Sequence, residues 1–268
     1  MDRKTPTRVT SSGHNLESHS ADPAEGYLWR LLRSGVVADE DGNPHQLHSN
    51  TSRAQCDFLQ RLVREADARS CLEIGLAYGI SSLAVCESIA GKADASLISI
   101  DPFQDAHWQN IGLLNLQRAG FFSMVEFHQR ASHEVLPDLL SAGRRIDFAY
   151  VDTTKIFDVV MVDAFFLLRL LKVGGLIVFD DCVWPGIRQL VRYLSSLPHV
   201  RVHATHGEYR ESRGRRIASA VTKVVPLRQR VFRQEIIATD EALGIDASCV
   251  AFIKIAEDDR QWDWSPRL

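Results

Sequence analysis

The feature that most constrains the fold is a regular alternation of short apolar runs with stretches of helical periodicity. The apolar runs predict strands at 70–74, 96–100, 125–128, 148–151, 176–179, 200–203 and 249–255. Helices are expected to begin between them, near Ser81, Asn110, Glu134, Phe157 and Trp184. This alternation is typical of βα units, whose strands form a parallel sheet. The sequence therefore predicts an α/β protein with a Rossmann-like, doubly wound sheet.

The domain organisation follows from length and local composition. A chain of 268 residues with 45% hydrophobic residues can bury one large core. Residues 1–24 offer few apolar groups to bury, so we expect a mobile tail. Residues 25–268 are expected to form one catalytic domain, which begins with leading helices in 25–67. Residues 207–246 are rich in arginine and predict a helical insertion, which is either a solvated helix face or a substrate lid or dimer contact.

Charge and apolar content exclude several classes of partner. The formal net charge of −3 gives no overall attraction to nucleic acid or anionic lipid. No apolar run approaches the roughly 20 residues that a membrane-spanning helix needs, and the N-terminus lacks the apolar core of a signal peptide. The five scattered cysteines lack the close pairs of a zinc site or redox motif, so most are expected to be small buried hydrophobic residues. We expect a cytoplasmic protein that acts on a small molecule, without nucleic acid or membrane partners, and a homodimer stays open.

A glycine turn follows the first strand of the predicted sheet, in a fold whose ligands bind beyond the carboxyl ends of the strands. The sequence there reads Glu73-Ile74-Gly75-Leu76-Ala77-Tyr78-Gly79-Ile80-Ser81, and its two glycines let the backbone approach a ligand closely. A dinucleotide fingerprint has a third glycine, and Glu73 would repel a pyrophosphate. An acid suits a cofactor that carries an ammonium group and a sulfonium. Glu73, Gly75, Gly79 and Ser81 are therefore expected to contact such a cofactor.

The next two strand ends supply further candidates. Asp101 ends the second strand, where a carboxylate can accept hydrogen bonds from both hydroxyls of a ribose. Taken singly, Glu73 and Asp101 are as well explained as helix caps or solvated acids, but together they favour a cofactor site. Ser132 and His133 follow the third strand and can meet an adenine, with a helix cap and a solvated histidine as the alternatives. His107 and Trp108 are candidates for the pocket wall, although packing is the more common role of a lone tryptophan.

Five motifs stand in order along the chain. They are Leu72-Glu73-Ile74-Gly75 with Gly79, Ile100-Asp101-Pro102-Phe103-Gln104, Ala131-Ser132-His133, Val151-Asp152-Thr153-Thr154-Lys155, and Phe179-Asp180-Asp181-Cys182-Val183-Trp184-Pro185-Gly186. Together they resemble the small-molecule O-methyltransferases of the catechol and caffeoyl-CoA type and their bacterial relatives. The similarity runs from about Tyr27 to Arg201 and returns at 249–255. It implies a class I methyltransferase with S-adenosylmethionine as cofactor and a seven-stranded, mostly parallel sheet whose last strand is antiparallel.

The resemblance also implies a divalent metal ion beside the methyl donor. The metal ligands of the catechol type match Asp152, Asp180 and Asp181, of which Asp152 would also contact the cofactor, and their catalytic lysine matches Lys155. Mg²⁺ or a similar hard cation suits such oxygen ligands and lowers the pKa of a bound hydroxyl. Lys155 would then be the general base.

Two departures bear on this metal site. Many bacterial relatives carry Asp-Gly-x-His where this chain has Asp152-Thr153-Thr154-Lys155, so the loop glycine and the usual histidine are both replaced. Asp181 stands where the catechol type has asparagine, which adds negative charge to the proposed site.

Metal-assisted O-methylation of a small molecule is the predicted function, and several alternatives stay open. Asp180 and Asp181 can serve as a helix N-cap, and Lys155 can be a solvated lysine. The functional alternatives are a metal-independent methyltransferase of the same fold, a nicotinamide-dependent oxidoreductase and a non-catalytic cofactor-binding subunit. Activity that withstands a chelator would select the first, and cofactor titration would separate the second. Binding without turnover would identify the third.

Overall fold

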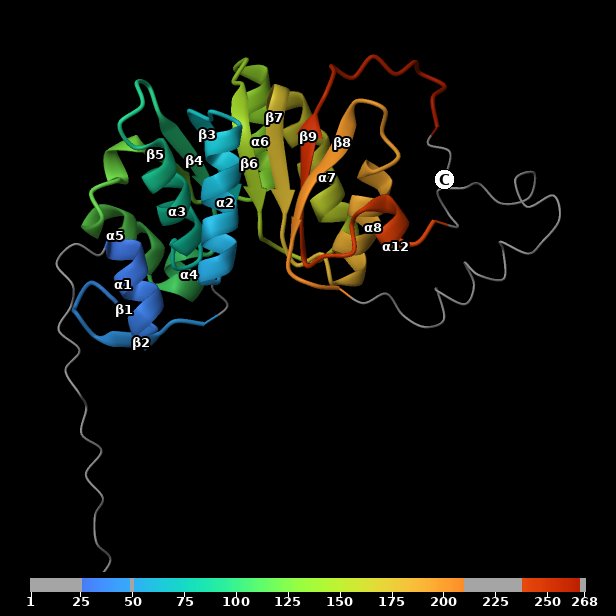
Figure 1. Cartoon of the computed structure of the whole chain (residues 1–268). Coiled ribbons are helices and arrows are strands. Elements are labelled where there is room, and N and C mark those ends of the chain that lie inside the picture. Colours follow the sequence, from blue (N-terminus) through green and yellow to red (C-terminus); the bar gives the residue numbers. More distant parts are fainter. Residues whose placement is uncertain (1–25, 49–50, 210–237, 266–268) are drawn as a thin grey trace, which may run out of the picture.

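The computed structural model describes residues 26–48, 51–209 and 238–265 of the chain. Its centre is a seven-stranded sheet with the strand order β5-β4-β3-β6-β7-β9-β8 (Figure 1). The predicted tail at 1–24 and most of the predicted insertion at 207–246 lie outside the described residues. The strands of this sheet are β3 (Ser70–Ile74), β4 (Ser96–Ile100), β5 (Val125–His128), β6 (Ile146–Val151), β7 (Leu171–Phe179), β8 (Val200–His206) and β9 (Cys249–Lys254).

The strand directions confirm the predicted fold class. Strands β3 to β7 are joined by parallel pairing, whereas β9, the last strand, pairs antiparallel with both β7 and β8. The predicted bounds of β3, β4 and β5 agree with the structure at both ends. Strands β6, β7 and β8 are longer than predicted, and β9 ends one residue earlier, at Lys254.

The order of the strands creates a switch point between β3 and β6. The chain passes from β3 outward to β4 and β5 and then returns to form β6 on the other side of β3. The carboxyl ends of these two central strands lie side by side, with Ile74 paired to Val151. Open parallel sheets bind their ligands in the crevice at this point.

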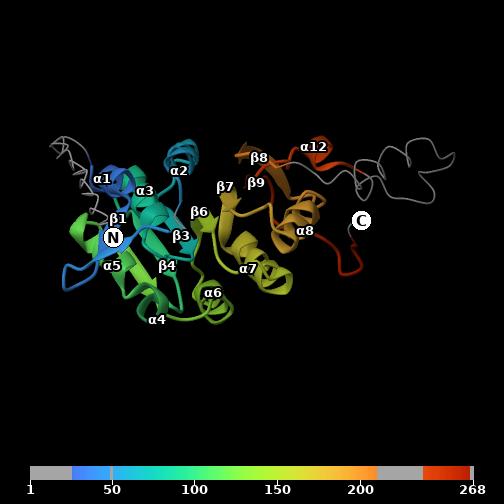
Figure 2. The same ribbon diagram turned by 90° about the horizontal axis from the view of Figure 1, so that it is seen from below.

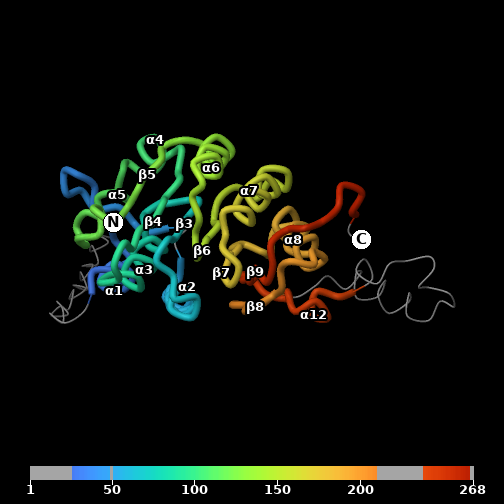
Figure 3. Tube along the Cα trace, turned by 90° about the horizontal axis from the view of Figure 1, so that it is seen from above, coloured from blue at the N-terminus to red at the C-terminus, as the bar shows by residue number. Residues whose placement is uncertain are grey.

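Helices cover both faces of the sheet, as the views along it show (Figures 2 and 3). One face packs on α1 (Tyr27–Ser34), α2 (Arg53–Glu65), α3 (Ile80–Ile89) and α5 (Ile111–Arg118), and the other on α6 (Ser132–Ser141), α7 (Phe157–Leu170) and α8 (Pro185–Leu194). Successive strand residues point to opposite faces, so Cys71 packs on the face that α1, α2, α3 and α5 cover, and Leu72 packs on the other face. All five cysteines are buried free thiols, as predicted. None of the described helices is long and apolar enough to cross a membrane.

Four short elements were not predicted from the sequence, namely β1 (Val36–Ala38), β2 (Pro44–Gln46), α4 (Gln104–Trp108) and the 3-10 helix η1 (Phe122–Met124). The short helix α12 (Asp240–Leu243) lies within the range 207–246, for which a helical insertion was predicted. Strands β1 and β2 form an antiparallel hairpin next to α1, near the carboxyl edge of the large sheet (Figure 1). The first of the leading helices expected in 25–67, α1, ends at Ser34, because Gly35 adopts a left-handed conformation with φ of 64°.

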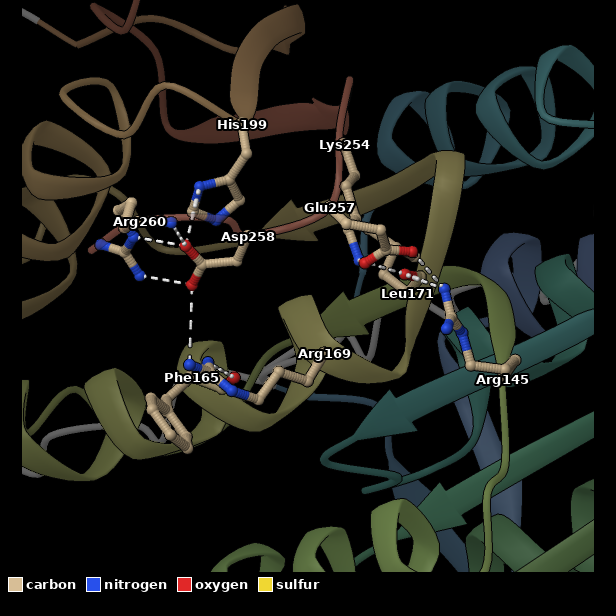
Figure 4. Close-up of polar contacts among 9 residues, drawn as sticks. All are labelled: Arg145, Phe165, Arg169, Leu171, His199, Lys254, Glu257, Asp258 and Arg260. Carbon is tan, nitrogen blue, oxygen red and sulfur yellow. Dashed lines mark hydrogen bonds and ion pairs between the residues drawn. The ribbon is translucent and has the colours of Figure 1, made fainter. Parts of the chain in front are cut away.

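The segment after β9 is attached to the opposite edge of the sheet, where β7 begins (Figure 4). The buried ammonium of Lys254 donates to the carbonyl oxygen of Leu171 at 2.8 Å and to Glu257 at 2.5 Å. Asp258 accepts two hydrogen bonds of 2.6 Å from the guanidinium of Arg260. These contacts leave the carboxyl edge of the sheet free of the C-terminal segment that the structure describes.

Candidate active site

A cavity of about 680 Å³ lies at the carboxyl edge, at the switch point between β3 and β6. Its volume is in the range of pockets that enclose small ligands. The residues that line it come from the turns after four strands and from the start of α2: Thr51, Gln55, Gly75, Leu76, Ala77, Tyr78, Ile80, Ser81, Asp101, Pro102, Phe103, His107, Trp108, Asp152, Thr153, Thr154, Lys155, Asp180 and Asp181. Nine of the residues predicted for the site are in this set, namely Gly75, Ser81, Asp101, His107, Trp108, Asp152, Lys155, Asp180 and Asp181.

The turn after β3 requires glycine for a reason that differs from our expectation. Gly75 has φ of 100°, and a Cβ built on it would overlap the backbone carbonyl of Asp152. The close approach therefore joins the ends of β3 and β6, although Gly75 also lines the cavity. Gly79 is the left-handed N-cap of α3 and packs against the backbone of Gly112, and it is not among the described residues that line the cavity.

Asp101 holds this turn in place while facing the cavity. Its Oδ2 accepts hydrogen bonds from the backbone N–H groups of Leu76 at 3.1 Å and Ala77 at 3.0 Å, and from the amide of Gln104 at 3.1 Å. Its Oδ1 accepts one bond of 2.9 Å, from the backbone N–H of Phe103. A carboxylate oxygen has about two acceptor positions, so Oδ1 can accept a further bond from a ligand hydroxyl.

Glu73 occupies a different place from the one that the sequence suggested. Its carboxyl group is fully buried and accepts hydrogen bonds from the hydroxyls of Ser81 and Ser82 at the start of α3. Burial raises the pKa of Glu73 to about 8, so the group is mostly neutral at pH 7. Glu73 is not among the described residues that line the cavity and carries little charge, so its contact with a cationic cofactor stays a prediction.

Ser132 and His133 lie at the start of α6, outside the set of described residues that line the cavity. Ser132 is buried, and His133 is exposed. Their predicted contact with an adenine stays a prediction.

The acidic end of the cavity is formed after β6 and β7. The ammonium of Lys155 lies 2.9 Å from Oδ1 of Asp152 and 2.6 Å from Oδ2 of Asp181, so it bridges the two carboxylates. Asp181 reaches this position from a left-handed backbone conformation with φ of 53°. Burial alone lowers the pKa of Lys155, but the two carboxylates outweigh it and raise the pKa above its ordinary value. Lys155 is thus a cation in this arrangement, which does not fit a general base.

Asp180 also lines this end of the cavity and is almost completely buried. Its Oδ2 accepts bonds from the hydroxyl of Tyr150 at 2.7 Å and the amide of Gln55 at 2.8 Å. Its Oδ1 accepts a bond of 2.7 Å from the backbone N–H of Asp181. Burial, reinforced by the charge of Asp152, raises the pKa of Asp180 to about 6.

Two groups of cavity residues were missed by the sequence reasoning. One is Gln55, whose signal was the Ser-x-x-Gln spacing of a capping box from Ser52. The other is Tyr78, which packs edge to face on Trp108, a predicted residue of the pocket wall, with 4.9 Å between ring centroids. The Nε2 of His48, which is outside the set of described residues that line the cavity, lies 2.9 Å from the hydroxyl of Tyr78.

The donor set suits a hard divalent cation in its chemistry. Three carboxylates, Asp152, Asp180 and Asp181, line the same end of the cavity, and oxygen ligands of this kind bind Mg²⁺. A positive group, the Lys155 ammonium, already lies between two of them and acts as a stand-in cation. In this side-chain arrangement no group of three such ligands in the described part of the chain is set to hold a metal ion. The residues therefore fit the ion by type, provided that Lys155 moves away from the carboxylates.

Comparisons with known proteins agree on one family. A sequence model described as O-methyltransferase matches residues 17–192. Tapetum-specific methyltransferase 1 of Arabidopsis thaliana is 29% identical over 209 residues, which cover 76% of this chain and 85% of that protein. Tricin synthase 1 of Oryza sativa subsp. japonica is 34% identical over 173 residues, covering 61% of this chain and 63% of that protein.

Solved structures of bacterial proteins share the fold. The O-methyltransferase TomG of Streptomyces achromogenes, solved in complex with SAM, is 25% identical with a TM-score of 0.51, covering 57% of this chain and 73% of that chain. An O-methyltransferase of Bacillus cereus in complex with SAH has a TM-score of 0.56 at 21% identity, covering 68% of this chain and 84% of that chain.

Proposed function

The chain belongs to the O-methyltransferase family, and from this premise we propose that its carboxyl-edge cavity aligns S-adenosylmethionine with a hydroxyl group of a small molecule. The enzyme is a methyltransferase that depends on S-adenosylmethionine. The nicotinamide-dependent and non-catalytic alternatives are set aside by this membership. The observation that carries the site proposal is that the turn after β3, Asp101 and the acidic end after β6 and β7 line one cavity.

The turn after β3 and Asp101 would hold the cofactor. Oδ1 of Asp101 has an acceptor position left for a ribose hydroxyl, and its Oδ2 fixes the loop that approaches the ligand. Asp152 is the proposed partner of the cofactor's ammonium group, because it lines the cavity as a partly exposed carboxylate. Glu73 accepts hydrogen bonds from Ser81 and Ser82 at the start of α3, which follows this turn, and it has no direct part in the proposal.

The transfer itself is an in-line displacement. The acceptor oxygen forms a bond to the methyl carbon while the bond from that carbon to sulfur breaks, which leaves S-adenosylhomocysteine and a methyl ether. Since the sulfonium is already activated, the main task of the protein is alignment, and well-oriented reactants can recover roughly 7–11 kcal/mol of the barrier. The hydroxyl proton must also leave, because a neutral hydroxyl is a poor nucleophile.

Asp152, Asp180 and Asp181 are the residues that would hold a divalent cation. Such an ion, when bound, lowers the pKa of an acceptor hydroxyl. In the described arrangement Lys155 neutralises Asp152 and Asp181 instead. The carboxylates of Asp152 and Asp181 raise the pKa of Lys155. We therefore propose that Lys155 accepts the hydroxyl proton only after its ion pairs with these two carboxylates have broken.

Metal dependence tests this part of the proposal. Enzyme stripped with a chelator and then dialysed would be assayed with methyl-labelled cofactor and a panel of hydroxylated aromatic compounds, with and without added Mg²⁺. We expect turnover that falls on stripping and returns with Mg²⁺. Full turnover in the stripped enzyme would show that the metal has no role and would select the metal-independent alternative. The homodimer and the cytoplasmic location stay predictions from the sequence.

A further inference from the structure

One side-chain amide joins the first turn of α2 to the acidic end of the cavity. The Oε1 of Gln55 accepts a hydrogen bond of 3.0 Å from the backbone N–H of Ser52. The Nε2 of the same amide donates a bond of 2.8 Å to Oδ2 of Asp180, a residue 125 positions away in the sequence. Both Gln55 and Asp180 line the cavity. The oxygen of the amide therefore stabilises the start of α2, and its nitrogen contacts the acidic end of the cavity.

The local contact does not explain why this residue is a glutamine. Ser52 and Gln55 form a capping box, in which the Ser52 hydroxyl accepts from the Gln55 backbone N–H at 3.2 Å. Glutamate serves at this position of a capping box as well as glutamine, because only a side-chain oxygen is needed. What glutamine adds is the N–H donor that faces Asp180. A glutamate there would place two carboxyl groups against each other.

Asp180 is 7% exposed, so its carboxylate depends on hydrogen bonds from the protein rather than from water. Tyr150, which is itself buried, and Gln55 both donate to its Oδ2, from β6 and α2 respectively. Tyr150 fixes Asp180 from within the sheet. Gln55 fixes it from the N-terminal part of the chain, whose Thr51 lines the same cavity.

We propose that Gln55 is a positioning residue for methyl transfer, which holds the Asp180 carboxylate in place and closes the start of α2 against the acidic end of the cavity. This inference rests on the proposed function, in which Asp180 acts on the acceptor side. Gln55 donates to Asp180, whereas Asp101 is held by the turn after β3 and by Phe103 and Gln104, so the loss of the Gln55 amide is expected to impair acceptor turnover and to leave cofactor binding nearly unchanged.

The variant Gln55→Glu tests this contact, because it keeps the capping oxygen and replaces the donor with a carboxylate oxygen that faces Asp180. We expect kcat/KM for the acceptor identified in the labelled-cofactor screen to fall about tenfold or more, with the affinity for S-adenosylhomocysteine within about twofold of wild type. The matched control is Ser52→Ala, which removes the cap and leaves the Gln55 amide. It is expected to lower the unfolding midpoint while kcat/KM stays within about twofold. Equal losses of kcat/KM in the two variants, or wild-type turnover in Gln55→Glu, would overturn the inference.

A second measurement needs no acceptor. The double variant Gln55→Glu with Asp180→Asn exchanges the amide and the carboxylate and can restore a hydrogen bond of reversed direction. We expect its urea midpoint to lie above the value that the two single variants predict by addition. Simple additivity would show that the two side chains do not interact, and would overturn the inference. Full turnover by Asp180→Asn alone would instead refute the acceptor-side role of Asp180 in the proposed function, whatever the unfolding cycle shows.

Discussion

Glu73 allows a quantitative prediction, because it is a fully buried acid with a strongly perturbed pKa. The pKa rises from 4.5 to about 8 through burial, which the hydrogen bonds from Ser81 and Ser82 only partly offset. Between these two values the folded protein binds a proton that the unfolded chain has lost. The free energy of unfolding therefore falls as the pH rises through this window, and the contribution of Glu73 is fully present only below the unfolded pKa.

The size of the effect follows from the two pKa values. One pKa unit corresponds to about 1.4 kcal/mol, so the loss between pH 5 and pH 8 amounts to roughly 3–4 kcal/mol. This is a large part of the roughly 5–15 kcal/mol by which most domains are stable. Glutamine has a similar shape and does not titrate, so Glu73→Gln removes this contribution to the pH dependence.

Urea unfolding followed by circular dichroism at pH 5, 6, 7 and 8 measures the effect in both proteins. The difference in unfolding free energy, wild type minus Glu73→Gln, cancels the other titrating groups, among them Asp163, whose pKa burial raises to about 6. We expect this difference to decline steadily toward pH 8. A difference that is constant over the range would refute a neutral, buried Glu73.

Two further predictions concern the site. Lys155→Met is expected to lower turnover by about 10²–10⁴-fold, the usual scale of general-base catalysis, with little change in cofactor affinity. Near-normal turnover with an unchanged pH profile would exclude Lys155 as the base. Gly75→Val is expected to lower the unfolding free energy by roughly 2–6 kcal/mol, because a positive φ and the overlap with the Asp152 carbonyl each cost about 1–3 kcal/mol. The control is Gly174→Val, which also has a positive φ but whose Cβ has open space. Urea unfolding of both variants separates the cost of the overlap from the cost of the backbone strain.

The sheet was predictable because its signals are local. Apolar runs such as 70–74 and 96–100 are bounded by polar and turn residues, and parallel strands buried on both faces are apolar throughout. The positions of Asp101, Asp152 and Asp180 followed from the same signals, since each stands directly after a strand. The hairpin of β1 and β2 has strands of three residues each, which is too short to show a period.

Other parts of the site depend on contacts between distant segments. Both faces of a parallel sheet are covered, so the alternation along β3 does not reveal whether Glu73 points to the cavity or to α3. The ion pairs of Lys155 with Asp152 and Asp181 depend on the left-handed backbone at Asp181, for which the sequence has no glycine signal. The contact from Gln55 to Asp180 spans two elements that only the completed fold brings together.

Binding of S-adenosylhomocysteine to wild type and to Asp101→Asn, measured by isothermal titration calorimetry, tests the central claim most directly. An asparagine can keep its carbonyl toward the N–H groups of Leu76 and Ala77, which places an amide donor where Oδ1 now accepts. We predict one site per chain in wild type and an affinity about tenfold to hundredfold weaker in Asp101→Asn, the scale of a lost hydrogen bond to a charged group. Asp105→Asn, an exposed acid of α4 outside the described cavity wall, is the matched control and should bind as wild type does. Absence of binding in wild type, or equal affinities in the three proteins, would contradict the assignment of this cavity to the cofactor.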